Sequence, residues 1–399
     1  MISHENALQE VLNLSSNFGS EEVHLSDCLG RVLAEPIHAD RDFPPFDRAT
    51  KDGIAINFVG IQSTNQNFPV SGMAQAGSPQ QHLLDVSQCI EVMTGAMVPK
   101  NADTVIMYEH LEEEDNGFSL RESVKKGQNI HYKASDVAQG EVLLQEGVQI
   151  SEAEIGVLAS VGKSKIQVKK LPKVAVISTG NELVDVEETP APHQIRKSNV
   201  HTLQALLKRL QIPSDCFHFI DDPSILKDKL GEILKNYDVM LLSGGVSKGK
   251  FDFLPQTFDA LGVEKIFHMV RQRPGKPFWF GQHKKSNTTI FSFPGNPVST
   301  FVSYHVYFKP WLNKTLGMAS PQFDVFLKEP TENTTDLTLF IGVGVDWVNG
   351  KLMAKRISTT GSGDLMALSK ADGFICLKPD EMVGAEQLVP FIPARNRIS

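Results

Sequence analysis

Between residue 173 and about residue 315 the sequence repeats one plan three times: an unbroken apolar segment, a glycine-bearing loop and helix-forming sequence. The three stretches are KVAVISTGNEL, DVMLLSGGVSKGKFDF and TTIFSFPGNPVSTFVSYHVYF. Apolar strands without polar alternation are buried on both faces, and strands that alternate with helices form parallel sheets. Loops at the carboxyl ends of parallel strands open onto one crevice. We therefore expect a central parallel α/β domain whose three glycine loops share one site.

The sequence before this region predicts helices at both ends of a β-rich module. Apolar residues at helical spacing indicate a helix over 4–15, and a second apolar helical patch, LGRVLAEPI, ends near Pro36. From about residue 46 to 136 short alternating segments broken by Pro, Gly and Asn are typical of strands. Ser151 with Glu154 three residues later forms a capping-box pattern, which predicts a helix over 152–161.

After residue 320 alternating strands return, with Asn349-Gly350 placed as a tight hairpin turn. The whole chain, at 399 residues, is long enough for two or more domains. We expect a multidomain α/β plus β protein that closes with a small β domain.

The formal net charge of -8 argues against a protein that coats nucleic acid or an anionic membrane, although a local cationic pocket stays open. The four cysteines, Cys28, Cys89, Cys216 and Cys376, include no CxxC pair, which fits a reducing compartment. No apolar run approaches the ~20 residues of a membrane-spanning helix, and the amino terminus lacks a signal-peptide pattern. We expect a cytoplasmic protein.

The first glycine loop, ISTGNEL, places Thr179, Gly180 and Glu182 where a strand at 174–178 gives way to an expected helix. Glycine there lets backbone N–H groups approach an anion, and the carboxylate suits Mg²⁺ or an amino group of a heterocycle. The alternative is that Glu182 only completes the amino terminus of that helix.

The second loop, SGGVSKGKFD, resembles the phosphate-loop pattern GxxxxGK, but Phe251 stands where that pattern needs Ser or Thr for Mg²⁺. An ATPase loop is therefore a poor interpretation, and a glycine nest for phosphate with Asp252 toward a metal is a better one. A tight turn with solvated charges is the alternative. The candidate binding residues of this loop are Ser243, Gly244, Gly245, Ser247 and Gly249.

Two further segments suit an anion. VRQRPGKPFWFG gathers Arg271, Arg273 and Lys276 around a Pro-Gly turn, and guanidinium groups match phosphate or molybdate geometrically. FPGNPVS forms a rigid turn before a helix and offers exposed N–H groups. Its candidate residues are Pro294, Gly295, Asn296, Pro297 and Ser299.

Carboxylates outside the α/β region could meet only through the fold, so spacing alone leaves each one as a turn or cap residue. They include Asp47, Asp52, Asp103, Glu109 and Asp136, with Thr94 between them. No HExxH, GxSxG or Cys-His pattern is present, which disfavours zinc hydrolases and acyl transfer.

In this order, the strings TKDGIAI, MTGAMVPKNADTVIM, ISTGNEL, SGGVSKGKFD, RPGKPFWFG and FPGNPVS resemble the molybdopterin molybdenumtransferase (MoeA-type) family, whose eukaryotic counterpart is the carboxyl-terminal domain of gephyrin. The resemblance covers nearly the whole chain. It implies a segmented amino-terminal domain (1–45 and 137–172), an inserted β-rich domain (46–136), a molybdopterin-binding α/β domain (173–319) and a carboxyl-terminal, small β-barrel-like domain (320–399). It also implies a homodimer with the active cleft between two subunits.

The resemblance further implies that molybdate is inserted into adenylylated molybdopterin with release of AMP, supported by Mg²⁺. Glu182 and Asp252 would then bind the metal, Asp221 and Thr179 with Gly180 would contact the nucleotide or pterin, and Arg273, Lys276 and Ser299 would bind phosphate or molybdate. Asp52, Thr94 and Asp136 would reach the reacting centre across the dimer interface. The molybdopterin adenylyltransferase and molybdoenzyme chaperones are implied partners.

Lys51, Lys197 and Lys248 depart from the family pattern by adding cations, and Arg273 stands where lysine is frequent, so tungstate in place of molybdate stays open. Three other functions compete. The related adenylyltransferase usually has Gly-Gly-Thr-Gly in its loop and lacks the extra domains, and a nucleotide amidase or pyrophosphatase would lack TKDGIAI and MTGAMVP. A gephyrin-like scaffold would use the same fold to bind partner peptides without releasing AMP.

Overall fold

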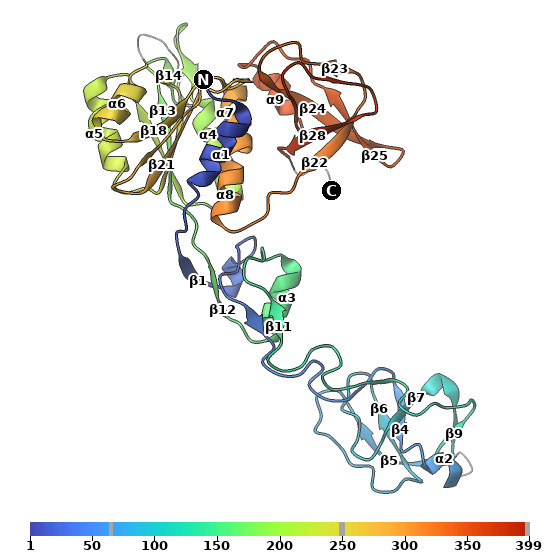
Figure 1. Cartoon of the computed structure of the whole chain (residues 1–399). Coiled ribbons are helices and arrows are strands. Elements are labelled where there is room, and N and C mark those ends of the chain that lie inside the picture. Colours follow the sequence, from blue (N-terminus) through green and yellow to red (C-terminus); the bar gives the residue numbers. More distant parts are fainter. Residues whose placement is uncertain (64–66, 247–251, 396–399) are drawn as a thin grey trace. The chain divides into compact units, whose positions relative to one another are not determined.

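The computed structural model describes residues 1–63, 67–246 and 252–395, which form two units (Figure 1). Unit 1 comprises Met1–Glu21, Gly30–Val32 and Gln167–Ser399, and unit 2 comprises Glu22–Leu29 and Leu33–Ile166. The predicted architecture of α/β and β domains is confirmed. The two units are coarser than the four predicted segments, whose boundaries stay predictions.

The described part of unit 1 contains a six-stranded sheet in the order β16-β13-β17-β21-β20-β18. The strands are β13 (Val174–Thr179), β16 (Ser214–Phe219), β17 (Val239–Ser243), β18 (Glu264–His268), β20 (Trp279–His283) and β21 (Thr288–Phe293). The three strands of the repeated plan, β13, β17 and β21, are parallel neighbours, as predicted. The sheet is mixed because β20 runs antiparallel to β21 through a short turn, in which Asn287 has φ 56°.

Helices cover both faces of this sheet, which explains why its strands are apolar throughout (Figure 1). Val176 and Leu241 point to one face, while Ile177 and Leu242 point to the other. The first face packs against α1 (His4–Asn13), α4 (Ser198–Arg209), α7 (Pro297–Ser303), the π-helical turn η3 (Tyr304–Phe308) and α8 (Lys309–Thr315). The second face packs against α5 (Pro223–Ile233) and α6 (Leu254–Ala260).

The predicted helix over 4–15 is α1, and it packs within unit 1 although we assigned it to the amino-terminal segment. Its apolar residues Ala7 and Val11 are fully buried in the core that contains Trp311. The Trp311 indole N–H also donates to the Leu14 carbonyl at 3.0 Å. The amphipathic pattern was therefore sufficient to predict the helix, but not its partner.

The helix predicted over LGRVLAEPI is wrong. Gly30 adopts φ 77°, and Leu33 donates its N–H to the Val148 carbonyl at 2.9 Å. Ile37 then begins β2 (Ile37–His38), which pairs with β11 (Val142–Leu144). The apolar residues are buried by pairing with a later segment of the same chain, which includes β11 and Val148. Helical spacing of apolar residues does not distinguish this outcome from a helix.

The carboxyl-terminal part of unit 1 is a barrel. Its strands are β22 (Phe323–Leu327), β24 (Thr338–Val348), β25 (Lys351–Arg356), β26 (Gly373–Leu377) and β28 (Leu388–Pro393), with β24 pairing β26 to close it. Smaller elements are β23 (Thr331–Glu332), α9 (Leu365–Lys370) and β27 (Met382–Val383). Asn349 (φ 50°) and Gly350 (φ 76°) form the predicted hairpin turn. From the α/β domain, β19 (Gln272–Arg273) pairs with β24.

Unit 2 contains the β-rich module. In the residues described, its main sheet has the order β7-β4-β6-β5-β9-β8. These strands are β4 (Gly53–Ile56), β5 (Asn67–Ala74), β6 (Cys89–Val92), β7 (Thr104–Met107), β8 (Leu111–Glu114) and β9 (Gly117–Leu120). β3 (Arg48–Ala49) pairs with β10 (Ile130–His131). The predicted capped helix is α3 (Glu152–Ser160), with Ser151 and Glu154 in a complete capping box.

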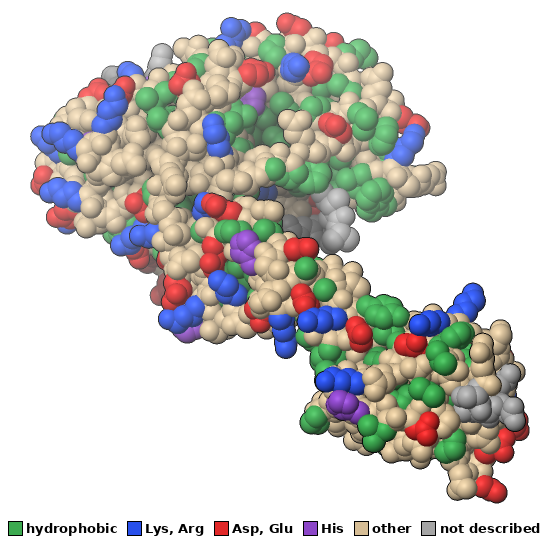
Figure 2. All heavy atoms as spheres, turned by 60° about the horizontal axis from the view of Figure 1, so that its bottom comes forward, with side chains coloured by type: hydrophobic (Ala, Val, Ile, Leu, Met, Phe, Trp, Pro, Cys, Tyr) green, Lys and Arg blue, Asp and Glu red, His purple; other side chains and the backbone are tan. Residues whose placement is uncertain are grey.

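Acidic and basic side chains are interspersed on the face shown in Figure 2, rather than gathered into regions of one sign. Among the helices of residues 1–63, 67–246 and 252–395, none has the length and apolar character needed to cross a membrane.

Candidate active site

The loops that follow β13, β17 and β21 meet at one edge of the central sheet. Asn199, in the first turn of α4, donates its side-chain N–H groups to Ser243 Oγ at 2.8 Å and to the Gly295 carbonyl at 2.6 Å. The Gly244 N–H donates to the Phe293 carbonyl at 3.1 Å. These bonds join the second loop to the third, which confirms the predicted convergence of the loops.

Glycine is required where the first and second loops touch. Gly244 and Gly245 have φ 105° and 70°, a region that residues with a Cβ rarely adopt. A Cβ on Gly245 would lie 2.7 Å from Leu254 Cδ1 and 2.8 Å from Thr179 Oγ1. That threonine hydroxyl is buried and has no hydrogen-bond partner among the described residues. The glycine loop is therefore held directly against the end of β13.

The segment after β13 is not the helix that we expected. Gly180 has φ 144°, and the chain continues into β14 (Leu183–Val184), which pairs with β15 (Ile195–Arg196) before α4 begins. Glu182 is exposed and does not stand at a helix amino terminus, so the capping explanation of this residue is wrong. Its carboxylate lies over Gly180, where a Cβ would be 2.6 Å from Oε2.

Asp221 lies within electrostatic range of two other carboxylates beside these loops, Glu182 and Asp252. The pKa of Asp221 is raised by burial of its carboxyl group and by the negative charges of Glu182 and Asp252. A bond from the Asp221 N–H to the Asn181 side chain holds the loop between them, at 3.1 Å. Like charges at close range favour a cation between them or a proton on one of them.

Basic residues approach the same edge from the other side of β21. Trp279, at the start of β20, pairs with Ser292 near the carboxyl end of β21. The Pro-Gly turn before Trp279 therefore lies at the sheet edge that carries the loops after β13, β17 and β21, here called the motif loops. His268 Nε2 lies 2.8 Å from the Val246 carbonyl and fixes this segment to the glycine loop. Arg273 and Lys276 are both exposed there.

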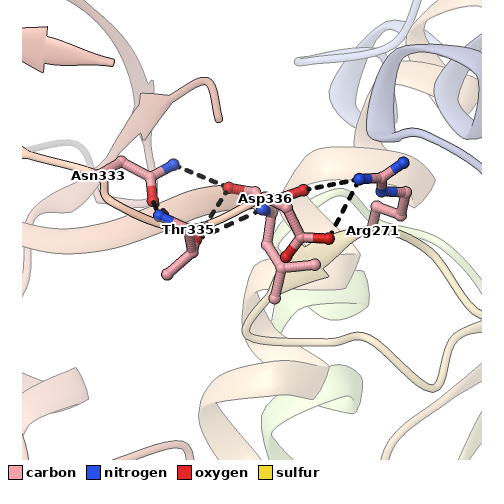
Figure 3. A network of polar contacts seen from close by, with 5 residues as sticks. Arg271, Asn333, Thr335 and Asp336 are labelled. Carbon is pink, nitrogen blue, oxygen red and sulfur yellow. Dashed lines mark hydrogen bonds and ion pairs between the residues drawn. The ribbon is translucent and has the colours of Figure 1, made fainter. Parts of the chain in front are cut away.

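Arg271, the third of the predicted cations, has an anionic partner within the chain. Its guanidinium pairs with the Asp336 carboxylate at 3.1 Å and contacts the Asp336 carbonyl at 3.4 Å (Figure 3). Asn333 supports that loop, because its side-chain oxygen accepts from the Thr335 N–H at 3.0 Å and hydroxyl at 2.7 Å. Arg271 thus links the α/β domain to the barrel.

The remaining residues of the third loop begin a helix. Pro297 is the first residue of α7, and Asn296 donates to Ser362 Oγ at 2.7 Å. Ser299 is 3% exposed, whereas Gly295 and Asn296 are exposed. Ser247, Lys248 and Gly249 of the second loop lie outside the described residues.

In unit 2 the structure brings Asp52 and Thr94 together. The Asp52 carboxylate accepts from the Thr94 N–H at 2.6 Å and from its hydroxyl at 2.7 Å, which lowers the Asp52 pKa. Both residues are exposed. Asp52 is therefore held ionised and oriented, as a group that positions a substrate requires.

Asp136 forms a second exposed group in unit 2. Its carboxylate lies 2.7 Å from His131 Nε2, and the Arg48 guanidinium donates to His131 Nδ1 at 3.0 Å. Both groups are joined to β3, because Ala49 exchanges hydrogen bonds with Gly95 and Ala96 beside Thr94, while Arg48 pairs with His131. Asp52, Thr94 and Asp136 thus flank one short strand.

Asn199, the residue that joins two of the loops, is not among the residues that the sequence suggested. Its place at the start of the helix after β15 is the only signal that could have indicated it. Lys197, one of the unusual cations, pairs with Asp185 at 2.6 Å. Burial lowers the pKa of His218, and the Lys197 charge lowers it further. Its positive charge is therefore partly offset within the site.

Comparisons with known proteins match three successive regions of the chain to one family. Residues 2–162 match a family profile described as the MoeA N-terminal region (domain I and II), residues 175–314 a probable molybdopterin binding domain, and residues 327–394 the MoeA C-terminal region (domain IV). A molybdopterin molybdenumtransferase from Synechocystis is 37% identical over 379 residues, covering 94% of this chain and 95% of the relative. The enzyme of that name from Staphylococcus epidermidis is 31% identical, covering 94% and 91%.

Among solved structures, the molybdopterin biosynthesis moea protein from Pyrococcus horikosii superposes with a TM-score of 0.84. It is 28% identical, over 99% of this chain and 100% of that one. The similarity therefore extends to every domain and to their order.

Proposed function

Because this chain belongs to the MoeA family and is a molybdopterin molybdenumtransferase of molybdenum cofactor biosynthesis, we propose that its substrate is adenylylated molybdopterin. In this proposal molybdate is placed on the dithiolene sulfurs, and cleavage of the pyrophosphate bond releases AMP. The convergence of three motif loops at one sheet edge, two of which Asn199 joins, is the observation that supports it best.

The motif loops supply the groups that a pyrophosphate requires. α4 and α7 both begin at this edge, and the first N–H groups of a helix, with its dipole, attract anions. Gly244 and Gly245 allow the backbone to approach a phosphate closely. Arg273 and Lys276 are exposed at the same edge and would bind the pterin phosphate or the oxyanion.

We also propose that Glu182 and Asp252 hold Mg²⁺. No set of three His, Cys, Asp or Glu side chains in the described ranges is arranged to bind a metal by itself. Mg²⁺ nevertheless suits one or two carboxylates completed by substrate phosphates and water, and Glu182 and Asp252, whose charges both act on Asp221, match that donor set. When bound, the ion would neutralise charge on the cleaved pyrophosphate.

The groups of unit 2 complete the proposal. We propose that the chain acts as a homodimer, in which Asp52, Thr94 and Asp136 of one copy position the substrate bound to the motif loops of the other. Support comes from their orientation by hydrogen bonds although they are exposed. A cytoplasmic location, supported by four free cysteine thiols, and contacts with the adenylyltransferase and molybdoenzyme chaperones belong to the same proposal.

AMP release from adenylylated molybdopterin tests this function. We expect release by the wild type to require Mg²⁺ and molybdate, and to fall at least about a hundredfold in Glu182→Gln and Asp252→Asn. Asp259→Asn, an exposed change on α6, serves as the matched control and should retain activity. A wild type that binds the substrate but releases no AMP with molybdate or tungstate would instead be a binding scaffold.

A further inference from the structure

A cavity of ≈ 500 Å³ lies in unit 1 between the end of α4, the π-helical turn η3 and the two ends of the barrel sequence. It is remote from the motif loops. α4 begins at the motif edge with Asn199, and its last residue, Arg209, lines the cavity. The chain then enters β16 at Ser214, which pairs with Val174, the first residue of β13, so this is the opposite edge of the sheet.

The cavity concentrates positive charge. Arg209, Lys309 and Arg395 all line it, and none of the described lining residues is acidic. Burial and repulsion from Arg209 lower the pKa of Lys309. Arg395 is fixed in place because it donates to the Leu368 and Ser369 carbonyls at 3.4 and 2.5 Å. Lys309 and Arg395 are half-buried and Arg209 is exposed, and cations placed close together are stabilised by an anion.

A buried polar side chain also lacks a partner there. Tyr304 is 1% exposed, and its hydroxyl has no hydrogen-bond partner among the described residues. Buried hydroxyls are normally paired, so an exception calls for an explanation such as an absent ligand. Burial raises the pKa of this hydroxyl against the opposing effect of the Arg209 charge, which keeps it protonated and able to donate.

The neighbouring residue, His305, offers a hydrogen-bond acceptor where Tyr304 offers a donor. His305 Nδ1 lies 2.9 Å from the Phe301 carbonyl, which can only accept, so the proton is on Nδ1. Burial lowers the pKa of His305 to about 4, so at neutral pH Nε2 is an acceptor. Tyr304 and His305 occupy a π-helical turn, a rare geometry that is frequent at functional sites.

The rest of the lining is largely apolar and includes Phe323, whose ring is 43% exposed. An exposed ring beside three cations provides a flat surface for stacking next to an anion-binding group. The volume falls within the range of about 300–1,000 Å³ that is usual for small-molecule sites.

We propose that this cavity is a second ligand site, distinct from the motif loops, that binds a small organic anion of the aryl phosphate class. Lys309 and Arg209 neutralise the phosphate, Tyr304 donates to one of its oxygens, and the aromatic ring of the ligand packs against Phe323. The site goes beyond the transferase reaction, because it lies at the edge of the sheet opposite the motif loops.

Isothermal titration of the full chain with phenyl phosphate, inorganic phosphate and phenol tests the proposal. Phenyl phosphate should bind saturably and more tightly than inorganic phosphate, while phenol should not bind measurably. Lys309→Gln should weaken phenyl phosphate binding about tenfold or more, and Tyr304→Phe about threefold or more. Lys208→Gln, an exposed change one residue before Arg209, should alter the dissociation constant less than about twofold.

Thermal unfolding supplies the control for folding. Lys309→Gln removes a partly buried cation, so it should melt no lower than the wild type, and phenyl phosphate should raise its melting temperature less than that of the wild type. Phenyl phosphate binding that survives Lys309→Gln and Tyr304→Phe but is lost in Asn199→Ala would place the anion at the motif loops and overturn the proposal. So would the absence of saturable binding.

Discussion

Neighbouring carboxylates in the candidate site have pKa values shifted in opposite directions, because their surroundings differ. Asp221 is partly buried beside Glu182 and Asp252, which raises its pKa. Its neighbour Asp222 accepts from the Ser224 hydroxyl and from N–H groups at the start of α5, which lowers its pKa. In the sequence Asp222 precedes Pro223, which is typical of a helix cap, whereas nothing there indicates the charges near Asp221. Only the fold assigns Asp221 to a charged cluster.

Asp221→Asn should therefore raise the melting temperature near neutral pH in the absence of divalent ions. A raised folded-state pKa means that the protonated carboxyl stabilises the fold below its unfolded pKa, and that this stability is lost as the pH rises through the folded value. The variant has no such loss, so the difference between its melting temperature and that of the wild type should shrink toward about pH 4. Thermal unfolding from neutral to acid pH measures the difference.

Asp222→Asn is the matched control, and the pH dependence should have the opposite sign. The lowered pKa of Asp222 contributes stability above the unfolded value that is lost as the pH falls through the folded one. Its variant should melt below the wild type at neutral pH and approach it in acid. Equal profiles for the two variants would contradict the assigned charge cluster.

Gly245→Ala should weaken substrate binding about tenfold or more and destabilise the fold by about 1–3 kcal/mol, because it combines a positive φ with a steric clash. The new Cβ would meet Leu254 and Thr179 at 2.7 and 2.8 Å. Gly262→Ala has a similar φ of 76° with nothing within 4 Å, so it should destabilise without affecting binding. Equilibrium binding and thermal unfolding of both variants separate strain from the clash.

Among the elements, strands buried on both faces were the most predictable. β13, β17 and β21 are continuous apolar runs, and their shared edge follows from parallel pairing alone. The helix predicted over LGRVLAEPI is wrong because apolar spacing indicates that residues are buried, but not whether a helix or a pairing loop buries them. The helix expected after ISTGNEL failed because β14 and β15 form a local pair first.

The residue that joins these elements was not predictable, because Asn199 contacts other loops and need not touch a ligand. Asn199→Ala removes two hydrogen bonds and leaves Ser243 and the Gly295 carbonyl without their donor. It should lower AMP release about tenfold and destabilise unit 1 by about 1–3 kcal/mol. Lys208→Ala on the exposed face of α4 should do neither, and an unchanged rate in Asn199→Ala would show that the loops hold their geometry without it.

For the whole molecule, spacing along the chain contains no information on which distant residues complete the site. Asp52, Thr94 and Asp136 were selected through the family resemblance. The structure shows that they flank β3 in unit 2, while the motif loops belong to unit 1. Whether one polypeptide or two supply a working site is therefore a question about assembly.

Mixing two inactive variants answers it. Asp52→Asn lacks the unit 2 carboxylate and Glu182→Gln lacks one at the motif loops. If each site combines unit 2 of one copy with the loops of its partner, half of the randomly mixed dimers contain one intact site of two, which restores about a quarter of wild-type AMP release. If both residues act within one polypeptide, each mixed dimer has two defective sites, and no activity returns. As a control, the double variant mixed with either single variant should stay inactive, because no pairing of those chains creates an intact shared site.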